Sequence, residues 1–242
     1  MAFSFKWLGQ GGFELRLGDR KVYIDPYLSD SVLGLDGFKR LPPVPIAPGE
    51  LCSDLIITTH DHMDHLDPET LGATDFERNM YAGPEDCLRH MRKLGIPEAR
   101  LKRLGAGDVA HVGEARIMGV PAFHTAPEAI GVIVEYKGVR LYISGVTLYD
   151  ARLRDIALMD VDIAFICING RLGNMECAQA VELARELKCR VAIPMHYGMF
   201  AENTADPHEF EQGLAGSGIY VHIPEFDREC EIYELLRRSE HG

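Results

Sequence analysis

The sequence is poor in basic residues and contains no long apolar run. Its 242 residues include 25 Lys and Arg against 37 Asp and Glu, which gives a formal net charge of −12. No nucleic-acid partner is expected, because such proteins usually present a basic surface that displaces counterions from phosphates. No membrane association is expected either, since no apolar stretch approaches the ~20 residues that cross a bilayer. Residues 1–7 also lack the pattern of a secretory signal.

Cysteine is sparse as well, and its spacing argues against a disulfide framework. The six cysteines lie far apart, with no Cys-x-x-Cys pair, at positions 52, 87, 167, 177, 189 and 230. Disulfide frameworks are denser and belong to small secreted chains. Cys167 falls within the apolar run 163–168, where a buried thiol is the simple interpretation. A cytoplasmic location is therefore expected.

A linker or a break in composition is also absent, so a single domain over residues 1–242 is predicted. Apolar content of 46% and charged content of 26% are close to globular averages, which argues against disorder. Residues 41–49 cannot form a helix or a central strand because they contain four prolines. This long loop is open to two interpretations, a wall of a substrate site or a plain connection.

Short β-branched runs between turn residues predict many strands and fewer helices. Strands at residues 3–8, 13–17 and 21–24, separated by Gly-rich turns, indicate an antiparallel meander. The pair Lys137-Gly138 predicts a tight hairpin turn. Further strands are predicted at residues 54–59, 109–112, 115–120, 130–136, 139–143, 162–168 and 190–194, and near 219–223 and 230–235. Helices are predicted at residues 84–94 and 176–187 and near 207–214. The pattern indicates an α+β fold with two sheets packed face to face and helices outside.

The strand predicted at residues 54–59 leads directly into the run His60-Asp61-His62-Met63-Asp64-His65. A polar surface loop that happens to be rich in histidine is one interpretation. Three imidazoles and two carboxylates within six positions favour a metal site instead. In an extended segment His60 and His62 would point the same way, so they could share one ion. Asp64 and His65 could then reach a second ion.

Two further histidines follow strands elsewhere in the chain. Catalytic zinc sites keep three protein ligands and leave one position for water, so two such sites need two more ligands. His124 and His196 both lie at strand-to-loop junctions, where functional side chains tend to gather. No role is assigned to the other histidines, His90, His111, His208, His222 and His241.

Several motifs together resemble those of a known family. The run Thr59-His60-Asp61-His62-Met63-Asp64-His65 resembles the His-x-His-x-Asp-His signature of the metallo-β-lactamase superfamily. Other motifs of the superfamily resemble Ile24-Asp25-Pro26, Phe123-His124-Thr125 and Ile193-Pro194-Met195-His196-Tyr197. More narrowly, residues 83–109, 175–187, 192–196 and 205–210 are similar to the L-ascorbate-6-phosphate lactonase-like branch. The resemblance covers nearly the whole chain and implies a four-layer αββα sandwich of two mixed β-sheets with outer helices.

The resemblance also implies a ligand set for one or two divalent metal ions. His60, His62 and His124 would hold the first ion, and Asp64, His65 and His196 would hold the second. Asp25 would stand behind a ligand histidine and orient it; the alternative is a turn residue before Pro26. Ligands rich in nitrogen favour Zn²⁺, while the lactonase-like branch implies Mn²⁺ as the alternative.

One position departs from the superfamily pattern. Val146 stands where an aspartate usually bridges the two metals, and its side chain cannot bind a metal. The site either works without a bridging carboxylate or is impaired. Without that carboxylate, two divalent ions, one hydroxide and Asp64 sum to a charge of about +2 instead of about +1. We therefore expect the first site to fill fully and the second only partly.

The expected activity is that of a metal-dependent hydrolase. A metal-bound hydroxide, held for attack by the catalytic Asp64, would cleave a small ester or lactone, with or without a phosphate group. One alternative is a phosphodiesterase that uses the same site. The other is a metal-binding protein of low activity, because Val146 replaces the bridging aspartate. The expected partner is a small-molecule substrate, and a homo-oligomer is left open.

Overall fold

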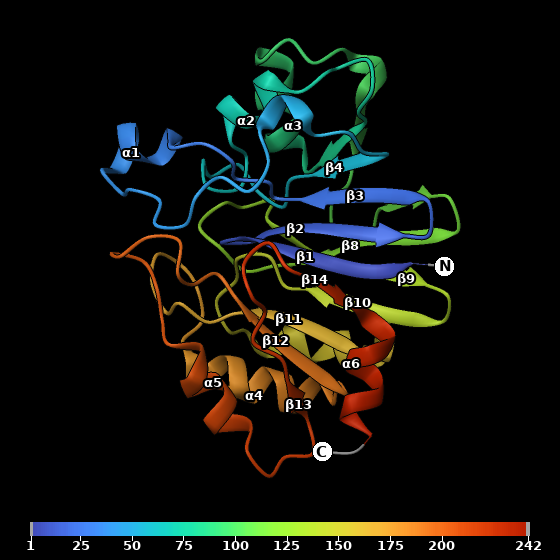
Figure 1. Ribbon diagram of the computed structural model, residues 1–242, viewed down its shortest axis with the longest axis vertical. Helices are drawn as coiled ribbons and strands as arrows, with labels where there is room; N and C mark the ends of the chain where they lie inside the picture. The colour runs from blue at the N-terminus through green and yellow to red at the C-terminus, as the bar shows by residue number, and fades with distance from the viewer. Residues whose placement is uncertain (1, 241–242) are drawn as a thin grey trace.

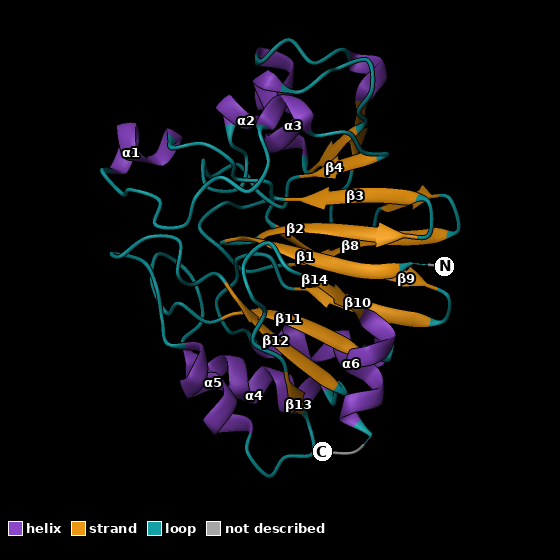
Figure 2. Ribbon diagram, viewed as in Figure 1, coloured by secondary structure: helices purple, strands orange, loops and turns teal. Residues whose placement is uncertain are grey.

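The computed structural model describes residues 2–240, which form two β-sheets packed face to face with helices on their outer sides (Figure 1, Figure 2). The first sheet has the order β14 (Glu229–Glu231), β1 (Phe3–Gly9), β2 (Gly12–Leu17), β3 (Arg20–Ile24), β4 (Leu55–Ile57), β5 (Tyr81–Gly83) and β6 (Leu101–Arg103). The second has the order β13 (Tyr220–Val221), β12 (Val191–Met195), β11 (Ile163–Cys167), β10 (Val139–Ile143), β9 (Ile130–Tyr136), β8 (Ala115–Pro121) and β7 (Val109–Val112). Each sheet contains parallel and antiparallel pairs. The predicted αββα sandwich of two mixed sheets is confirmed.

Six α-helices and three 3₁₀ segments are found within the described residues. The helices are α1 (Ser31–Asp36), α2 (Pro68–Ala73), α3 (Glu85–Lys93), α4 (Cys177–Leu187), α5 (Pro207–Leu214) and α6 (Ile232–Ser239). The 3₁₀ segments cover Pro48–Glu50, Glu98–Arg100 and Ala151–Met159. Helix α3 packs on β5 and β6 of the first sheet, and α4 packs on β11 of the second. No helix in residues 2–240 is long and apolar enough to cross a membrane.

The inner faces of the two sheets share one hydrophobic core. Phe5 and Phe13 of the first sheet both contact Phe165 of the second, with ring centroids 5.0 Å apart and the rings edge to face. Burying a phenylalanine contributes about 1.5–3 kcal/mol to stability, so this aromatic cluster ties the sheets together. The shared core supports the prediction of a single domain, which stays a prediction.

Most of the predicted elements are present, and one is wrong. The turn Lys137-Gly138 joins β9 to β10 with φ of +52° and +77°, the backbone of a tight two-residue hairpin. The strand predicted near residues 230–235 is instead the short β14 followed by α6. A helix forms there because Ile232, Leu235 and Leu236 recur at helical spacing and are buried together.

The topology brings one end of several strands to the same edge of the molecule. Strand β3 pairs in parallel with β4, and β10, β11 and β12 pair in parallel with one another. Strand β8 points the same way as β10, because β9 runs antiparallel to both. The segments that follow these strands therefore gather at the edge towards which β3 points (Figure 1).

Candidate metal centre

All six predicted ligands lie at this edge, on the segments that follow β4, β8 and β12. The sequence suggested an extended run from His60 to His65. The structure shows that this run instead forms a turn. The backbone N–H groups of His65 and Leu66 both donate to the carbonyl of His62, at 3.0 and 2.7 Å. This turn separates the run into two parts, and each part joins a different histidine from the second half of the chain.

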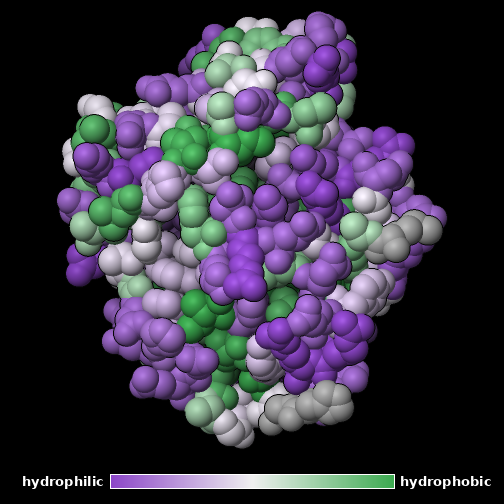
Figure 3. All heavy atoms as spheres, viewed as in Figure 1, coloured by the Kyte–Doolittle hydropathy of each residue, from purple (hydrophilic) through white to green (hydrophobic). Residues whose placement is uncertain are grey.

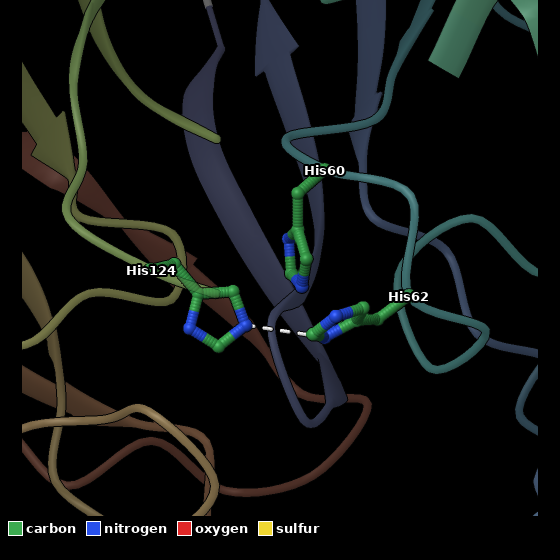
Figure 4. Close-up of side chains that lie close together, drawn as sticks. All are labelled: His60, His62 and His124. Atoms are coloured by element: carbon green, nitrogen blue, oxygen red, sulfur yellow. Dashed lines mark hydrogen bonds between the residues drawn. The ribbon is translucent and has the colours of Figure 1, made fainter. Parts of the chain in front are cut away.

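The first triplet is His60, His62 and His124, whose potential ligand atoms lie within 4.8 Å of one another. Figure 4 shows the three rings turned towards a common point, with His124 Nε2 and His62 Nδ1 3.1 Å apart. His60 is buried, His124 is half-buried and His62 is exposed. The triplet therefore opens towards solvent on the side of His62.

The second triplet is Asp64, His65 and His196, which meet the same spacing. The Nε2 atoms of His65 and His196 are 3.2 Å apart, and Asp64 Oδ2 lies 3.5 and 3.6 Å from them. Both histidines are buried. His196 has a φ of +65°, a left-handed conformation that is uncommon outside glycine. Such strain gathers at functional sites, where the surrounding structure maintains it.

Asp25 lies behind both triplets and is fully buried. Its Oδ1 accepts the backbone N–H of Thr59 at 2.7 Å. Its Oδ2 accepts the Thr59 hydroxyl at 2.6 Å and His65 Nδ1 at 2.7 Å. Because the Thr59 hydroxyl donates to Asp25, its oxygen accepts from His60 Nδ1, 3.1 Å away. Asp25 thus orients His65 directly and His60 through Thr59.

These hydrogen bonds fix which ring nitrogen carries the proton. His60 and His65 each donate through Nδ1, and His124 Nδ1 donates to the carbonyl of Gly173 at 3.0 Å. His60 and His124 therefore turn an Nε2 lone pair towards the cluster, and Nε2 of His65 also faces it, 3.2 Å from His196 Nε2. His60 Nε2 is buried without a hydrogen-bond partner. An orphaned acceptor of this kind is explained by a cation at the cluster.

Charge states in the cluster also suit a divalent cation. Burial lowers the pKa of His60, of His196 and of His124, the last to about 4, so these rings are neutral. Burial opposes ionisation of Asp64, but the charge on His65 holds the pKa of that carboxyl well below its usual range. Burial likewise opposes the charge on His65, yet Asp64 and Asp25 raise its pKa to about 10. His60, His124, His196 and Asp64 are therefore in the forms that bind metals, whereas His65 would release its Nε2 proton when a metal binds.

The geometry fits a metal at each triplet. Ligand nitrogens around tetrahedral zinc are about 3.3 Å apart for bonds of about 2.0–2.1 Å, and the two closest N–N pairs here are 3.1 and 3.2 Å apart. Asp25, His60 and His65 also meet the spacing for a metal group. Both oxygens of Asp25 already accept hydrogen bonds, however, so an orienting role suits it better.

The sequence analysis missed Gln10, which supports the second triplet from the turn between β1 and β2. The side-chain Nε2 of Gln10 donates to Asp64 Oδ2 at 2.7 Å, and the backbone carbonyl of Gln10 accepts the backbone N–H of His196 at 3.0 Å. Its φ of +51° is left-handed. The neighbouring Gly11 has no room for a side chain, since a Cβ there would lie 2.7 Å from His65 Cε1. The sequence signal that could have identified Gln10 is a polar residue flanked by glycines.

Val146 follows β10 and is buried against the same cavity that the two triplets line. The position usually taken by a bridging carboxylate therefore presents a hydrocarbon side chain. Of the five histidines without a predicted role, four lie outside both triplets, and His241 lies outside the described residues.

Comparison with known proteins identifies the family. The model of the beta-lactamase superfamily domain matches residues 20–197. A UPF0173 metal-dependent hydrolase of Thermoplasma acidophilum is 30% identical over 235 residues, which cover 93% of this chain and 97% of that protein. Igni18, a metallo hydrolase of Ignicoccus hospitalis, superposes with a TM-score of 0.77 at 21% identity, over 95% of this chain and 98% of that chain. An isothiocyanate hydrolase from Delia radicum gut bacteria gives a TM-score of 0.78 at 17% identity, over 95% and 99%. The chain therefore belongs to the metallo-β-lactamase superfamily and is a metal-dependent hydrolase.

Proposed function

We propose that this hydrolase cleaves a small carbonyl ester or lactone at a centre formed by the two triplets. The observation that carries the proposal is the pairing of the triplets along one cavity, with Asp64 as the single carboxylate among six side chains. Such an arrangement suits the attack of water on a carbonyl carbon. The ester or lactone is the substrate that the resemblance to the lactonase-like branch implies.

Each residue has a distinct role in this proposal. His60, His62 and His124 hold one divalent ion, and Asp64, His65 and His196 hold the other. Bound ions of this kind lower the pKa of water towards neutrality and polarise a substrate carbonyl. Asp64 is also the catalytic carboxylate, because it accepts a hydrogen bond from the attacking water and orients it. Gln10 fixes Asp64 in place for this role.

Zinc is the proposed metal because five of the six ligands are nitrogen donors, and manganese is the alternative. We propose full occupancy of the first triplet and partial occupancy of the second, because Val146 supplies no bridging charge. Metal analysis of protein purified without added metal tests this. The expected content lies between about one and two equivalents per chain, and two tightly held equivalents would refute partial occupancy.

A second candidate function follows from Val146 alone. Loss of the bridging carboxylate leaves a metal-binding protein with little turnover, a sensor or a scaffold. Phosphodiester hydrolysis at the same centre has no comparable support, because the lining residues of the cavity include three carboxylates and no Lys or Arg among those described.

A substrate screen separates these functions. Lactones, thioesters and phosphodiester reporters are offered with zinc and with manganese to the wild type and to two variants. His62→Ala removes an exposed ligand, and His111→Ala removes an exposed histidine of β7 as a matched control. Ester or lactone turnover should disappear in His62→Ala and persist in His111→Ala. Equal turnover in wild type and His62→Ala would refute hydrolysis at this centre.

We also propose a cytoplasmic location and a single domain. All six cysteines have free side chains, as a reducing compartment predicts. The shared core of the two sheets supports the single domain. Fractionation of the expressing cells tests the first proposal, and one cooperative unfolding transition of the metal-free protein would support the second.

A further inference from the structure

The described residues that line the cavity of both triplets include no Lys or Arg. The cavity volume is about 590 Å³, within the roughly 300–1,000 Å³ typical of small-molecule sites. Asp36, Asp61 and Asp64 contribute three carboxylates, and none of the described lining residues is Lys or Arg. A phosphate or carboxylate carried by the substrate away from the reacting bond would have no cationic partner in this wall.

Two arginines that flank the wall in sequence are directed to backbone oxygens. Arg40 is buried and donates to the carbonyls of Tyr27 at 2.8 Å and Pro42 at 2.9 Å. Arg171 donates to the carbonyl of Glu202 at 3.1 Å. Neither arginine lines the cavity. These guanidinium groups therefore stabilise the loops and do not reach the cavity wall.

Apolar side chains form much of the remaining wall. Leu35 of α1 and Leu172 in the loop after β11 both line the cavity, although each leaves 65% of its surface exposed. Phe38 and Met63 add to the same wall. Figure 3 shows apolar side chains at the surface over α1. Exposed leucines gathered at the mouth of a cavity indicate a surface that binds apolar groups.

The backbone at Leu172 is strained. Its φ is +53°, an outlier for a bulky residue without a turn-forming side chain. The loop is held by a buried chain of amides, in which Asn174 donates to Asn169 and Asn169 donates to Asn203, both at 2.6 Å. An exposed leucine maintained in a strained conformation by buried hydrogen bonds is explained if its side chain contacts a ligand.

We infer that the substrate carries an uncharged, apolar acyl group, which packs against Leu35, Phe38 and Leu172 while its carbonyl reaches the two triplets. This inference rests on the proposed function and narrows it, because it excludes substrates with an anionic group at that end. Hydrolysis then adds water across the acyl C–O bond, so the acyl carbon gains the water oxygen and the alcohol leaves with a proton.

A homologous series of esters tests the inference. The kcat/KM of the metal-loaded protein is measured with p-nitrophenyl acetate, butyrate and hexanoate, which yield the acid and p-nitrophenol. Burial of each added methylene should raise kcat/KM by about fourfold in the wild type. Leu172→Ala should flatten this dependence. Leu158→Ala is the matched control, since Leu158 is 83% exposed and does not line the cavity.

A positive charge placed on the cavity wall provides a second test of the same inference. Mono-p-nitrophenyl adipate has the chain length of the hexanoate ester but ends in a carboxylate. Leu172→Lys should raise kcat/KM for the adipate ester relative to the hexanoate ester by about fivefold, the strength of an exposed ion pair. Leu158→Lys should leave this ratio unchanged. The metals are common to all variants, so their attraction for carboxylates cancels from the comparison.

Anilides resist hydrolysis more than esters do, so their binding can be measured without turnover. Their binding distinguishes a failure of this inference from a failure of the proposed function. The Kd values of N-phenylacetamide and N-phenylhexanamide are measured by calorimetry. If no ester is cleaved but the hexanamide binds more tightly and loses this advantage in Leu172→Ala, the proposed ester hydrolysis fails and the apolar site stands. If esters are cleaved but neither kcat/KM nor Kd depends on chain length, the inference is overturned and the proposed function stands.

Discussion

The two triplets line one cavity but are held in different ways. In the second triplet His65 donates a hydrogen bond to the buried Asp25, and Asp64 accepts one from the side chain of Gln10. The backbone N–H of His196 donates to the backbone carbonyl of Gln10. In the first triplet His62 is exposed. His124 is oriented at Nδ1 by one hydrogen bond, to the backbone carbonyl of Gly173 in a loop.

This contrast involves two influences on metal retention, the geometric support of the ligands and the net charge of the site. The second triplet is preorganised by buried partners and contains Asp64, so its geometry favours metal retention. The absence of a bridging carboxylate at Val146 leaves more uncompensated positive charge, which opposes retention of a second ion. The first triplet has the reverse character, with looser support and no carboxylate. Which factor dominates is decided by variants that change one factor at a time.

The largest expected difference concerns stability of the metal-free protein. His65→Ala removes the partner of a fully buried carboxylate, and breaking a buried pair costs about 3–5 kcal/mol. His62→Ala changes an exposed residue, so the free energy of unfolding should shift by less than about 0.5 kcal/mol. Urea unfolding after treatment with a chelator measures both. Equal destabilisation by the two changes would contradict the difference between the triplets.

The next effect concerns Asp25, which supports the second triplet directly and the first through Thr59. Asp25→Ala should weaken metal binding at both by about 10–100-fold, because it frees His65 and, through Thr59, His60. Metal affinity is measured by competition with a chromogenic chelator. Asp54→Ala is the matched control, since Asp54 also accepts a backbone N–H but pairs with Arg20 away from the cavity. A change confined to the second triplet would show that Thr59 does not transmit the effect.

Val146→Asp tests the role of charge directly. A carboxylate at this buried position would contribute to binding the second ion, and retention should improve by about tenfold if the gain resembles one charge-assisted contact of about 1.5 kcal/mol. Metal content after dialysis measures the gain. Val120→Asp is unsuitable as a control because it would bury a charge in the core, so Val146→Asn serves instead, with similar size and no charge. Equal retention in both variants would exclude the charge argument.

The activity of Val146→Asp separates the two proposed functions. If the wild type is a metal-binding protein impaired by valine, the restored carboxylate should raise turnover strongly. If the centre is adapted to valine, turnover should change little while metal content rises. The measurement is kcat with saturating zinc, so that differences in occupancy do not enter.

Local sequence patterns identified the candidate ligands more readily than their supports. His60 to His65 are contiguous, and His124 and His196 each follow an apolar strand, so all six could be named as candidates from the sequence. Gln10 could not, because its contact with Asp64 spans 54 positions and requires the turn between β1 and β2 to face the β4 end. The support Asp25 was named only through the family resemblance, and the contacts of both supports depend on the tertiary fold, which no local pattern contains.

The same limit applies to the elements of the fold. Long amphipathic or alternating segments such as α4 and β8 were predicted because burial on one face imposes their period. Helix α1 was not predicted, since it is six residues long and contains Gly34, which disfavours helix. Yet α1 contributes Leu35 to the cavity wall. The elements that shape substrate selection are thus the ones least determined by local propensity.

The smallest expected effect isolates the support of the first triplet. A Cβ at Gly173 would lie 2.6 Å from His124 Nδ1, so Gly173→Ala must displace the ring or the loop. The φ of +91° at Gly173 adds strain of about 1–3 kcal/mol. Gly198→Ala is the matched control, because Gly198 also has a positive φ but an added Cβ would meet nothing within 4 Å.

Gly173→Ala should therefore weaken metal binding at the first triplet by several-fold and leave the second unchanged, while Gly198→Ala should affect stability alone. Cobalt substitution distinguishes the two sites, since their donor sets differ by one carboxylate and should absorb differently. Asp25 and Gln10 bond to His65 and Asp64, so a loss at the second triplet would indicate coupling between the two triplets. Such a loss would show that the two triplets act as one unit, and the contrast in their supports would then have no consequence for metal retention.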